Sequence, residues 1–187
     1  MIEIMSALLL LLNSLAGREC TFAAGAPVFH LGDIVRVVYV VRSGVIHLIR
    51  HQDDGSALIL QRAGQASVLA EASLYSSRYH CEARAEVAAV TWAIPRTDLR
   101  RRLEQGPELA FAWSRHLAHE VQQARLHSEI LSLKTVEARL NAWIGWHGNL
   151  PEKGLWAAVS YEIGVSPEAL YREIAKRRKS RSRANQR

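Results

Sequence analysis

The spacing of apolar residues changes once along this 187-residue chain, near Pro95, and that change limits the folds available to it. Between Phe22 and Pro95, β-branched runs such as VRVVYVV and VIHLIR are separated by Gly and Asp, a pattern typical of antiparallel strands. Asp54-Gly55 predicts a tight hairpin. Roughly six to eight short strands are expected, which would close into a small barrel or roll. After Pro95 the spacing becomes three to four, which predicts helices.

Composition places the chain among ordered proteins, since 49% of its residues are hydrophobic. The longest apolar run, Ala7 to Leu12, is too short to span a bilayer, and Glu3 replaces the basic start of a signal peptide. We therefore expect a packed or interfacial N-terminal helix. Two cysteines make neither a zinc quartet nor a secreted disulfide framework, which favours a reducing cytoplasm; one disulfide or a redox role stays open.

A long helix is predicted from Pro107 to about Leu131, with an apolar stripe close to a coiled-coil seam. The stripe predicts a homodimer interface made by Trp113, Leu117, Val121, Ala124 and Leu131. The alternative is that it packs on the roll of its own chain. A second apolar set, Phe111, Ala118 and Leu126, lies off the seam. One face of the helix could therefore contact the roll while the other contacts the same helix of a second copy.

The segment Leu155 to Arg178 predicts two short helices around a tight turn, which is the shape of a helix-turn-helix. Gly164 suits a left-handed turn, Ser166 can cap the second helix and Pro167 fits its first position. Such a pair of helices also occurs in other small helical domains. The residues expected to face DNA are Ser166, Glu168, Tyr171, Arg172, Lys176, Arg177, Arg178 and Lys179.

Positive charge is concentrated at the C-terminus. The last twelve residues, KRRKSRSRANQR, contain seven Lys or Arg and no acid, so a chain of net charge +6 has about −1 on residues 1–175. A basic arm beside a helix-turn-helix favours salt-sensitive contact with phosphates. A disordered basic tail can also solubilise a protein or bind an anionic membrane.

The order of these segments resembles the Crp/Fnr superfamily of bacterial transcription regulators. The resemblance rests on FAAGAPVFHLGDIVRVVYVVRSGVIHL, RAGQASVLAEASLY, LSLKTVEARLNAWI and EIGVSPEALYREIA. It implies an α+β fold with an antiparallel, cupin-like and cyclic-nucleotide-binding-like β-roll, a long dimerisation helix and a C-terminal helix-turn-helix. It also implies a dimer on a palindromic DNA site. The expected division is 1–98 for the N-terminal helix and effector-sensing roll, 99–133 for the long helix and hinge, 134–178 for the DNA-binding domain and 179–187 for the basic tail.

The effector segment AEASLYSSRYHCEARA departs from the family's cyclic AMP pattern of Gly-Glu followed by Arg-Ser/Thr-Ala. By this resemblance Glu71 matches the ribose-binding carboxylate and Arg78 the phosphate ligand. However, Ala70 replaces the glycine and Tyr79-His80 stands where small residues would admit a nucleotide. The family's adenine-facing pair falls near Ala124-Arg125. The departures argue against a cyclic nucleotide, and the effector candidates are Glu71, Arg78, His80, Cys81 and Arg125.

His80 and Cys81 offer imidazole and thiolate ligands for copper, zinc or haem iron. Adjacent residues on a strand point to opposite faces, so the two are not expected to share one metal within a chain, and the alternative is that they are packed or exposed without a ligand. Two cysteines cannot build an intramolecular four-cysteine iron-sulfur cluster. The metal and cofactor therefore stay unassigned.

The DNA-reading end also departs from the family. Its recognition helix usually begins Ser-Arg-Glu, whereas this chain has Ser166-Pro167-Glu168 and a later Arg172, so a different operator is expected. No segment after Arg178 predicts a β-wing, and the basic arm could replace its phosphate contacts.

We therefore expect a cytoplasmic, homodimeric, sequence-specific transcription regulator controlled by an effector, redox or metal signal on the roll. The alternative is a ligand-sensing or protein-interaction module whose degenerate helix-turn-helix binds DNA only non-specifically. An enzyme is not expected, because no Ser/His/Asp set, phosphate-binding Gly loop or carboxylate pair stands out. The expected partners are double-stranded DNA and a second copy of the chain, with RNA polymerase as a further candidate and no membrane.

Overall fold

The computed structural model describes residues 2–53, 57–69 and 71–184, and the chain divides into two compact units, residues 1–120 and 121–187. The boundary falls inside α3 (Pro107–Ser132). The hairpin predicted at Asp54-Gly55 lies outside the described residues. No helix in the described ranges is long and apolar enough to cross a membrane.

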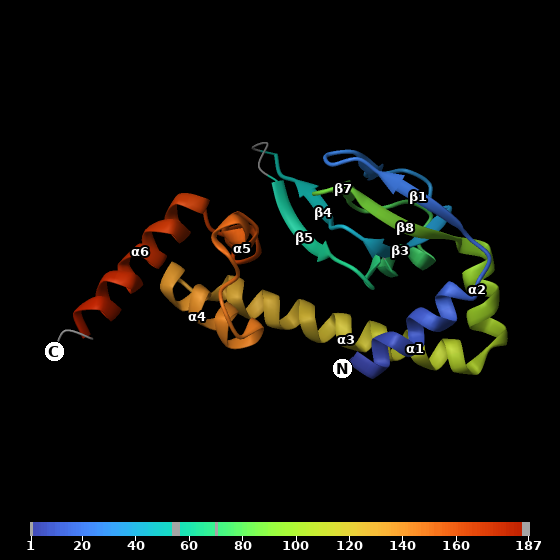
Figure 1. Ribbon diagram of the computed structural model, residues 1–187. Helices are drawn as coiled ribbons and strands as arrows, with labels where there is room; N and C mark the ends of the chain where they lie inside the picture. Colours follow the sequence, from blue (N-terminus) through green and yellow to red (C-terminus); the bar gives the residue numbers. More distant parts are fainter. Residues whose placement is uncertain (1, 54–56, 70, 185–187) are drawn as a thin grey trace. The chain divides into compact units, whose positions relative to one another are not determined.

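Two four-stranded antiparallel sheets form the roll of the first unit (Figure 1). Their orders are β1-β8-β3-β6 and β2-β7-β4-β5. This arrangement confirms the predicted antiparallel roll. The strands are β1 (Arg18–Phe22), β2 (Pro27–Phe29), β3 (Val37–Ser43), β4 (Ile46–His51), β5 (Ala57–Ala63), β6 (Val68–Leu69), β7 (Glu82–Ala85) and β8 (Ala89–Pro95).

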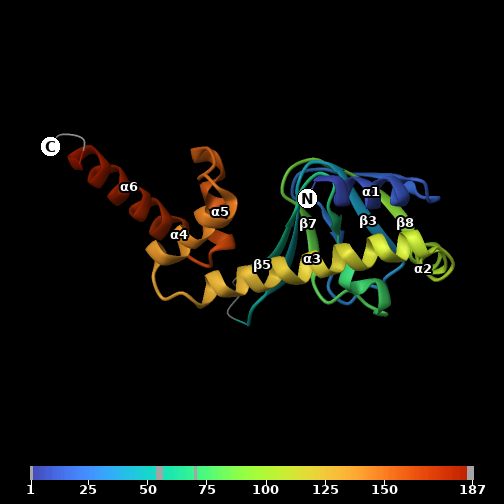
Figure 2. The same cartoon turned by 90° about the horizontal axis from the view of Figure 1, so that it is seen from below.

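Strand β3 shows why the run VRVVYVV is apolar at consecutive positions. Tyr39 and Val41 belong to the core inside the roll, while Val38 and Val40 belong to a second core on the other face of the sheet. Leucines of α1 (Ile2–Asn13) and the first turns of α3 complete that second core (Figures 1 and 2). Fully burying each such side chain contributes about 1.5–3 kcal/mol, so β3 holds both layers together. The remaining elements of the first unit are the short helix η1 (Glu71–Tyr75) and α2 (Arg96–Gln105).

Short helices pack around one apolar core in the second unit. They are α4 (Val136–His147), η2 (Lys153–Leu155), α5 (Trp156–Glu162) and α6 (Pro167–Ala184). Thr135 caps α4, because its hydroxyl accepts a hydrogen bond from the Ala138 amide at 3.1 Å. Helix α6 continues past Lys179 to Ala184, so the predicted tail 179–187 begins as helix. No strand follows α6 in the part of the chain that the structure describes.

Gly44 joins β3 to β4 at a position where only glycine fits. Its φ is +83°, and a Cβ there would lie 2.6 Å from the Ala89 Cα. We expect Gly44→Ala to lower the free energy of unfolding by about 2–4 kcal/mol, measured by urea denaturation. Gly64→Ala is the control, since a Cβ at Gly64 meets nothing within 4 Å and should change stability little. Equal stability losses in the two variants would contradict this reading of the turn.

Candidate functional site

Helices α5 and α6 and the turn between them form the candidate nucleic-acid interface. Gly164 has a φ of +62°, as the sequence predicted for the turn. The Ser166 hydroxyl accepts a hydrogen bond from the Ala169 amide at 3.2 Å and so caps α6, which begins at Pro167. Leu170 and Ile174 are buried against α5, which fixes the face of α6 that is left to solvent.

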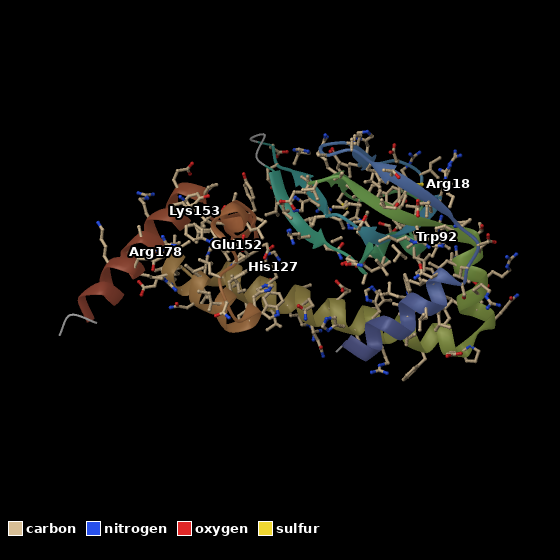
Figure 3. All side chains as sticks on the ribbon, in the orientation of Figure 1. Arg18, Trp92, His127, Glu152, Lys153 and Arg178 are labelled. Atoms are coloured by element: carbon tan, nitrogen blue, oxygen red, sulfur yellow. The ribbon has the colours of Figure 1, made fainter. Side chains whose placement is uncertain are left out.

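Four basic side chains of α6 that the sequence assigned to DNA have different surroundings. Lys176 Nζ lies 3.0 Å from the Glu137 carboxylate, which raises the pKa of Lys176 and lowers that of Glu137. Arg177 pairs with Glu173 at 2.9 Å. The Arg178 guanidinium lies 5.2 Å from the centre of the Trp156 ring (Figure 3). Arg172 is exposed and has no hydrogen bond or ion pair within the described residues.

The other four residues that the sequence assigned to DNA are Ser166, Glu168, Tyr171 and Lys179. Ser166 caps α6, as described above. The Glu168 carboxylate interacts with its own backbone amide and with the Ser166 hydroxyl, and both contacts lower the pKa of Glu168. The Tyr171 ring packs 5.5 Å from Trp156. Lys179 is exposed at the far end of the described side chains. The helix therefore presents Arg172, Lys179 and the ionised Glu168 to solvent, while several basic neighbours are held by the protein itself.

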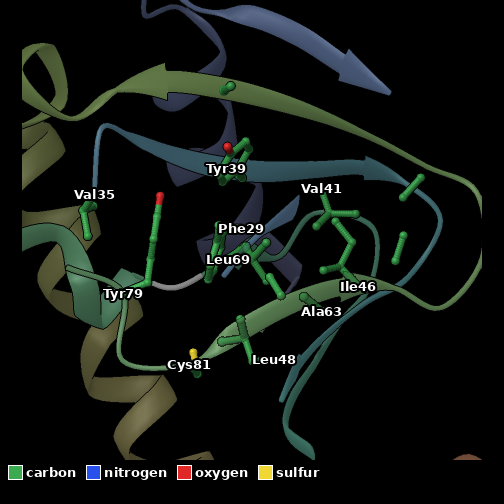
Figure 4. Packing of buried hydrophobic residues seen from close by; sticks show 14 residues of the cluster. Phe29, Val35, Tyr39, Val41, Ile46, Leu48, Ala63, Leu69, Tyr79 and Cys81 are labelled. Atoms are coloured by element: carbon green, nitrogen blue, oxygen red, sulfur yellow. The ribbon is translucent and has the colours of Figure 1, made fainter. Parts of the chain in front are cut away.

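Aromatic side chains fill the interior of the roll (Figure 4). The Tyr79 ring stacks on Phe29 with centroids 3.7 Å apart, and its hydroxyl donates to the Val37 carbonyl at 2.7 Å. Tyr39 stacks on the other side of Phe29 at 6.2 Å. Burial raises the pKa of Tyr79, so the hydroxyl stays protonated. Tyr79 thus occupies the interior with a large side chain where the family pattern has small residues.

The effector candidates have different surroundings, although the Glu71 charge adds to the burial that raises the pKa of Cys81. Arg78 is exposed, and its Nη1 donates to the Gly32 carbonyl at 2.6 Å. Cys81 is 1% exposed inside the roll, whereas its neighbour His80 is exposed and lies 3.2 Å from the Ser73 hydroxyl. Arg125 belongs to the second unit. Among the described residues, no three His, Cys, Asp or Glu side chains are arranged to hold a metal ion.

Glu71 faces helix α3 instead of Arg78. Burial, together with the charge of Glu120 on α3, raises the pKa of Glu71 to about 7. Burial also raises the pKa of Glu120, whose Oε1 lies 3.9 Å from His116 Nδ1. His116 is 3% exposed, burial lowers its pKa, and neither ring nitrogen has a hydrogen-bond partner within the described residues. Glu71, Glu120 and His116 therefore form a group of poorly solvated polar side chains in the first unit.

The structure corrects part of the predicted dimer interface. Trp113 is 3% exposed and packs with Leu8, Leu12 and Val38 in the core of its own unit, with Leu117 beside it. Trp113 is therefore not available to a partner helix, and Leu117 is only partly exposed. Exposed apolar residues of α3 lie instead at Phe111, Val121 and Leu126. Helical spacing identified an apolar stripe but could not show which surface covers it.

Arg139 is a functional candidate that the sequence analysis did not predict. It shares the inward side of α4 with Val136, Leu140 and Trp143, yet it carries a charge. A charged side chain on an apolar helix face has to find hydrogen-bond acceptors, and this requirement was the available signal. Its guanidinium donates to backbone carbonyls at the ends of α3 and α5.

A protein-family model matches most of the roll and the helix that follows it. Residues 19–105 match the model of the cyclic nucleotide-binding domain family. No curated protein sequence matches the chain.

Solved structures resemble most of the chain. FixK2 from Bradyrhizobium japonicum is 17% identical, with a TM-score of 0.75 over 89% of this chain and 86% of that one. The c-di-GMP-responsive global regulator CLP of Xanthomonas campestris is 17% identical, with a TM-score of 0.71 over 96% and 93%. A CRP-family transcriptional regulator from Thermus thermophilus is 15% identical, with a TM-score of 0.68 over 86% and 85%.

The pKa of Glu71 predicts how stability depends on pH. The folded pKa of about 7 exceeds the value of 4.5 for a free carboxyl, so the folded state binds more protons between these values and stability falls as pH rises through them. We expect Glu71→Gln to be more stable than the wild type by about 1–3 kcal/mol at pH 8 and nearly equal to it at pH 5. Urea unfolding at both pH values tests this, with the exposed Glu104→Gln as control. A Glu71→Gln variant that gains nothing at pH 8 would show that this carboxyl is not held as described.

Proposed function

We propose that this chain, which has a cyclic nucleotide-binding-family domain and the fold of the Crp/Fnr superfamily, is a homodimeric transcription regulator that binds specific DNA through α6. The capped helix α6 behind the Gly164 turn supports the proposal most directly, because a recognition helix reads base edges with residues near its N-terminus. The proposed setting is the cytoplasm, with RNA polymerase as a further partner. No catalytic role is proposed.

Base reading is assigned to Arg172 and Glu168. Arg172 is exposed near the start of α6, and its charge helps to lower the pKa of Glu168 one turn earlier. Within the described residues its guanidinium forms no hydrogen bond, so it can form two with guanine. Glu168 lies one turn earlier, and its lowered pKa keeps it ionised as an acceptor for the cytosine amino group. The combination of a donor and an acceptor on one helix favours sequence reading over attraction to phosphates alone.

Phosphate contact is assigned to Lys179 and the basic residues that follow it. Lys176 and Arg177 already pair with Glu137 and Glu173, so contact with phosphates would require them to leave these carboxylates. The pairs also reduce the positive potential of α6 and with it the sequence-independent part of the affinity. The alternative function, a module that binds DNA only non-specifically, receives less support from this arrangement.

The dimer is assigned to exposed apolar residues of α3 from both sets described above. Phe111 is 65% exposed, Val121 48% and Leu126 41%. Exposed large apolar residues recurring along one long helix are typical of a helix that pairs with a copy of itself.

The signal that controls the regulator is left unassigned. The stacked rings of Tyr79 and Phe29 occupy the interior of the roll, so we do not propose that a cyclic nucleotide binds there. Glu71 keeps the position of the family's ribose-binding carboxylate in the sequence but is directed at α3.

Arg172→Ala should weaken binding to the best-bound duplex by about 1–3 kcal/mol and relax preference at one base pair, because one bidentate contact is lost. Lys179→Ala should weaken binding to all sequences alike and reduce the slope of log K against log salt by about one. Fluorescence anisotropy titrations on matched and scrambled duplexes at several salt concentrations measure both effects. If Arg172→Ala weakens all duplexes equally, the base-reading role is wrong and the non-specific module is favoured.

Phe111→Glu combined with Val121→Glu should convert a dimer into a monomer, because two charges would be buried at the helix pair. Sedimentation equilibrium gives the mass in solution. Leu31→Glu is the matched control, since Leu31 is 66% exposed on a loop of the roll. A double variant that keeps the dimer mass would contradict the assigned face.

A further inference from the structure

The Arg139 side chain joins the ends of two helices. Its Nε donates to the Leu133 carbonyl at 2.7 Å and its Nη2 to the Leu131 carbonyl at 2.8 Å, where α3 ends. Its Nη1 donates to the Ile163 and Gly164 carbonyls at 3.0 and 2.8 Å, where α5 ends. The last carbonyls of a helix lack intrahelical partners and carry partial negative charge, so one guanidinium satisfies two helix ends. Lysine could not span both, because its ammonium is a compact point charge.

Further contacts hold the same junction. His127 Nε2 lies 2.6 Å from the carbonyl oxygen of Glu162, the last residue of α5. Helix α3 therefore also contacts the end of α5. Ile130 of α3 is 3% exposed in the core shared with α5 and α6. A Cβ on Gly164 would lie 2.8 Å from Leu131 Cδ2 and 3.2 Å from Arg139 Nη1. The end of α3 therefore packs directly against the turn that precedes α6.

We infer that Arg139 is a positioning residue that sets the direction of α6 relative to the last turns of α3, and that it thereby determines the spacing between DNA half-sites. The inference rests on the proposed function. In a dimer formed through α3, the partner helix fixes the direction of α3, and the Arg139 junction relates α6 to that direction. The distance and angle between the two recognition helices then depend on the junction.

Half-site spacing reports this role directly. Each base pair added between half-sites moves them about 3.4 Å apart and rotates them by about 35°. A rigid junction resists such a change, so affinity should fall steeply on either side of one spacing. A junction without Arg139 would let each α6 follow its half-site. A merely structural contribution would lower stability but leave the preferred spacing equally sharp.

The test measures affinity of the full-length dimer for palindromes in which the spacing is changed by one or two base pairs. Wild type should lose about tenfold or more per base pair from the optimum, whereas Arg139→Gln should vary by about threefold or less over the series. Affinity of Arg139→Gln for a single half-site, and its dimer mass, should stay close to wild type. Arg139→Lys should also flatten the series, and it serves as the second variant if Arg139→Gln unfolds.

Two controls separate positioning from stability and from base reading. Thr135→Ala removes the cap of α4 and so destabilises the same unit without touching the junction, and it should keep the wild-type dependence on spacing. Arg172→Ala should lower affinity at every spacing without flattening the series. If both Arg139 variants retain the steep wild-type dependence, the inference is wrong while the proposed function stands. If wild type binds no DNA in preference to random duplex, the proposed function fails and the inference with it.

Discussion

Hydrogen bonds from one guanidinium to four backbone carbonyls are the interaction on which the second unit depends. Arg139 satisfies the ends of α3 and α5, and the chain reverses beside it at Gly164. Trp143 adds a hydrogen bond from its indole to Glu162 at 2.8 Å. The turn determines the direction in which α6 leaves α5. Contacts at the ends of α3 and α5 therefore influence where the exposed Arg172 lies.

The first unit fills the interior of its roll with its own side chains. Most of the roll lies within the residues that match the cyclic nucleotide-binding domain model, and Tyr79 and Phe29 stack inside it. Glu71 stays in the sequence position of a ligand residue but lies in a buried polar group with Glu120 and His116. Burial raises the pKa of Glu71 to about 7, so a large fraction of this carboxyl is protonated at neutral pH, which reduces its repulsion with Glu120.

Local sequence signals predicted those elements that local physics determines. The positive φ of Gly164 and the Ser166 cap followed from residue type and position, and the β-branched run of β3 predicted a strand. The covering of α3 could not be predicted in the same way, since Trp113 packs on residues about a hundred positions earlier in the chain. Lys176 looked available for DNA because its partner Glu137 lies on another helix. Matching Glu71 and Arg78 to the cyclic AMP-binding pattern also could not predict which groups their side chains contact.

The central claim is that the protein reads a specific DNA sequence through α6. The most direct test selects bound sequences from a random pool of double-stranded DNA, with the purified full-length chain at physiological salt. The account predicts a palindromic consensus with one half-site spacing and a guanine among its most strongly preferred bases, because two exposed Arg172 side chains would read related positions. Enrichment of no sequence, with binding that only follows salt concentration, would contradict the account and leave a module that binds DNA through charge alone.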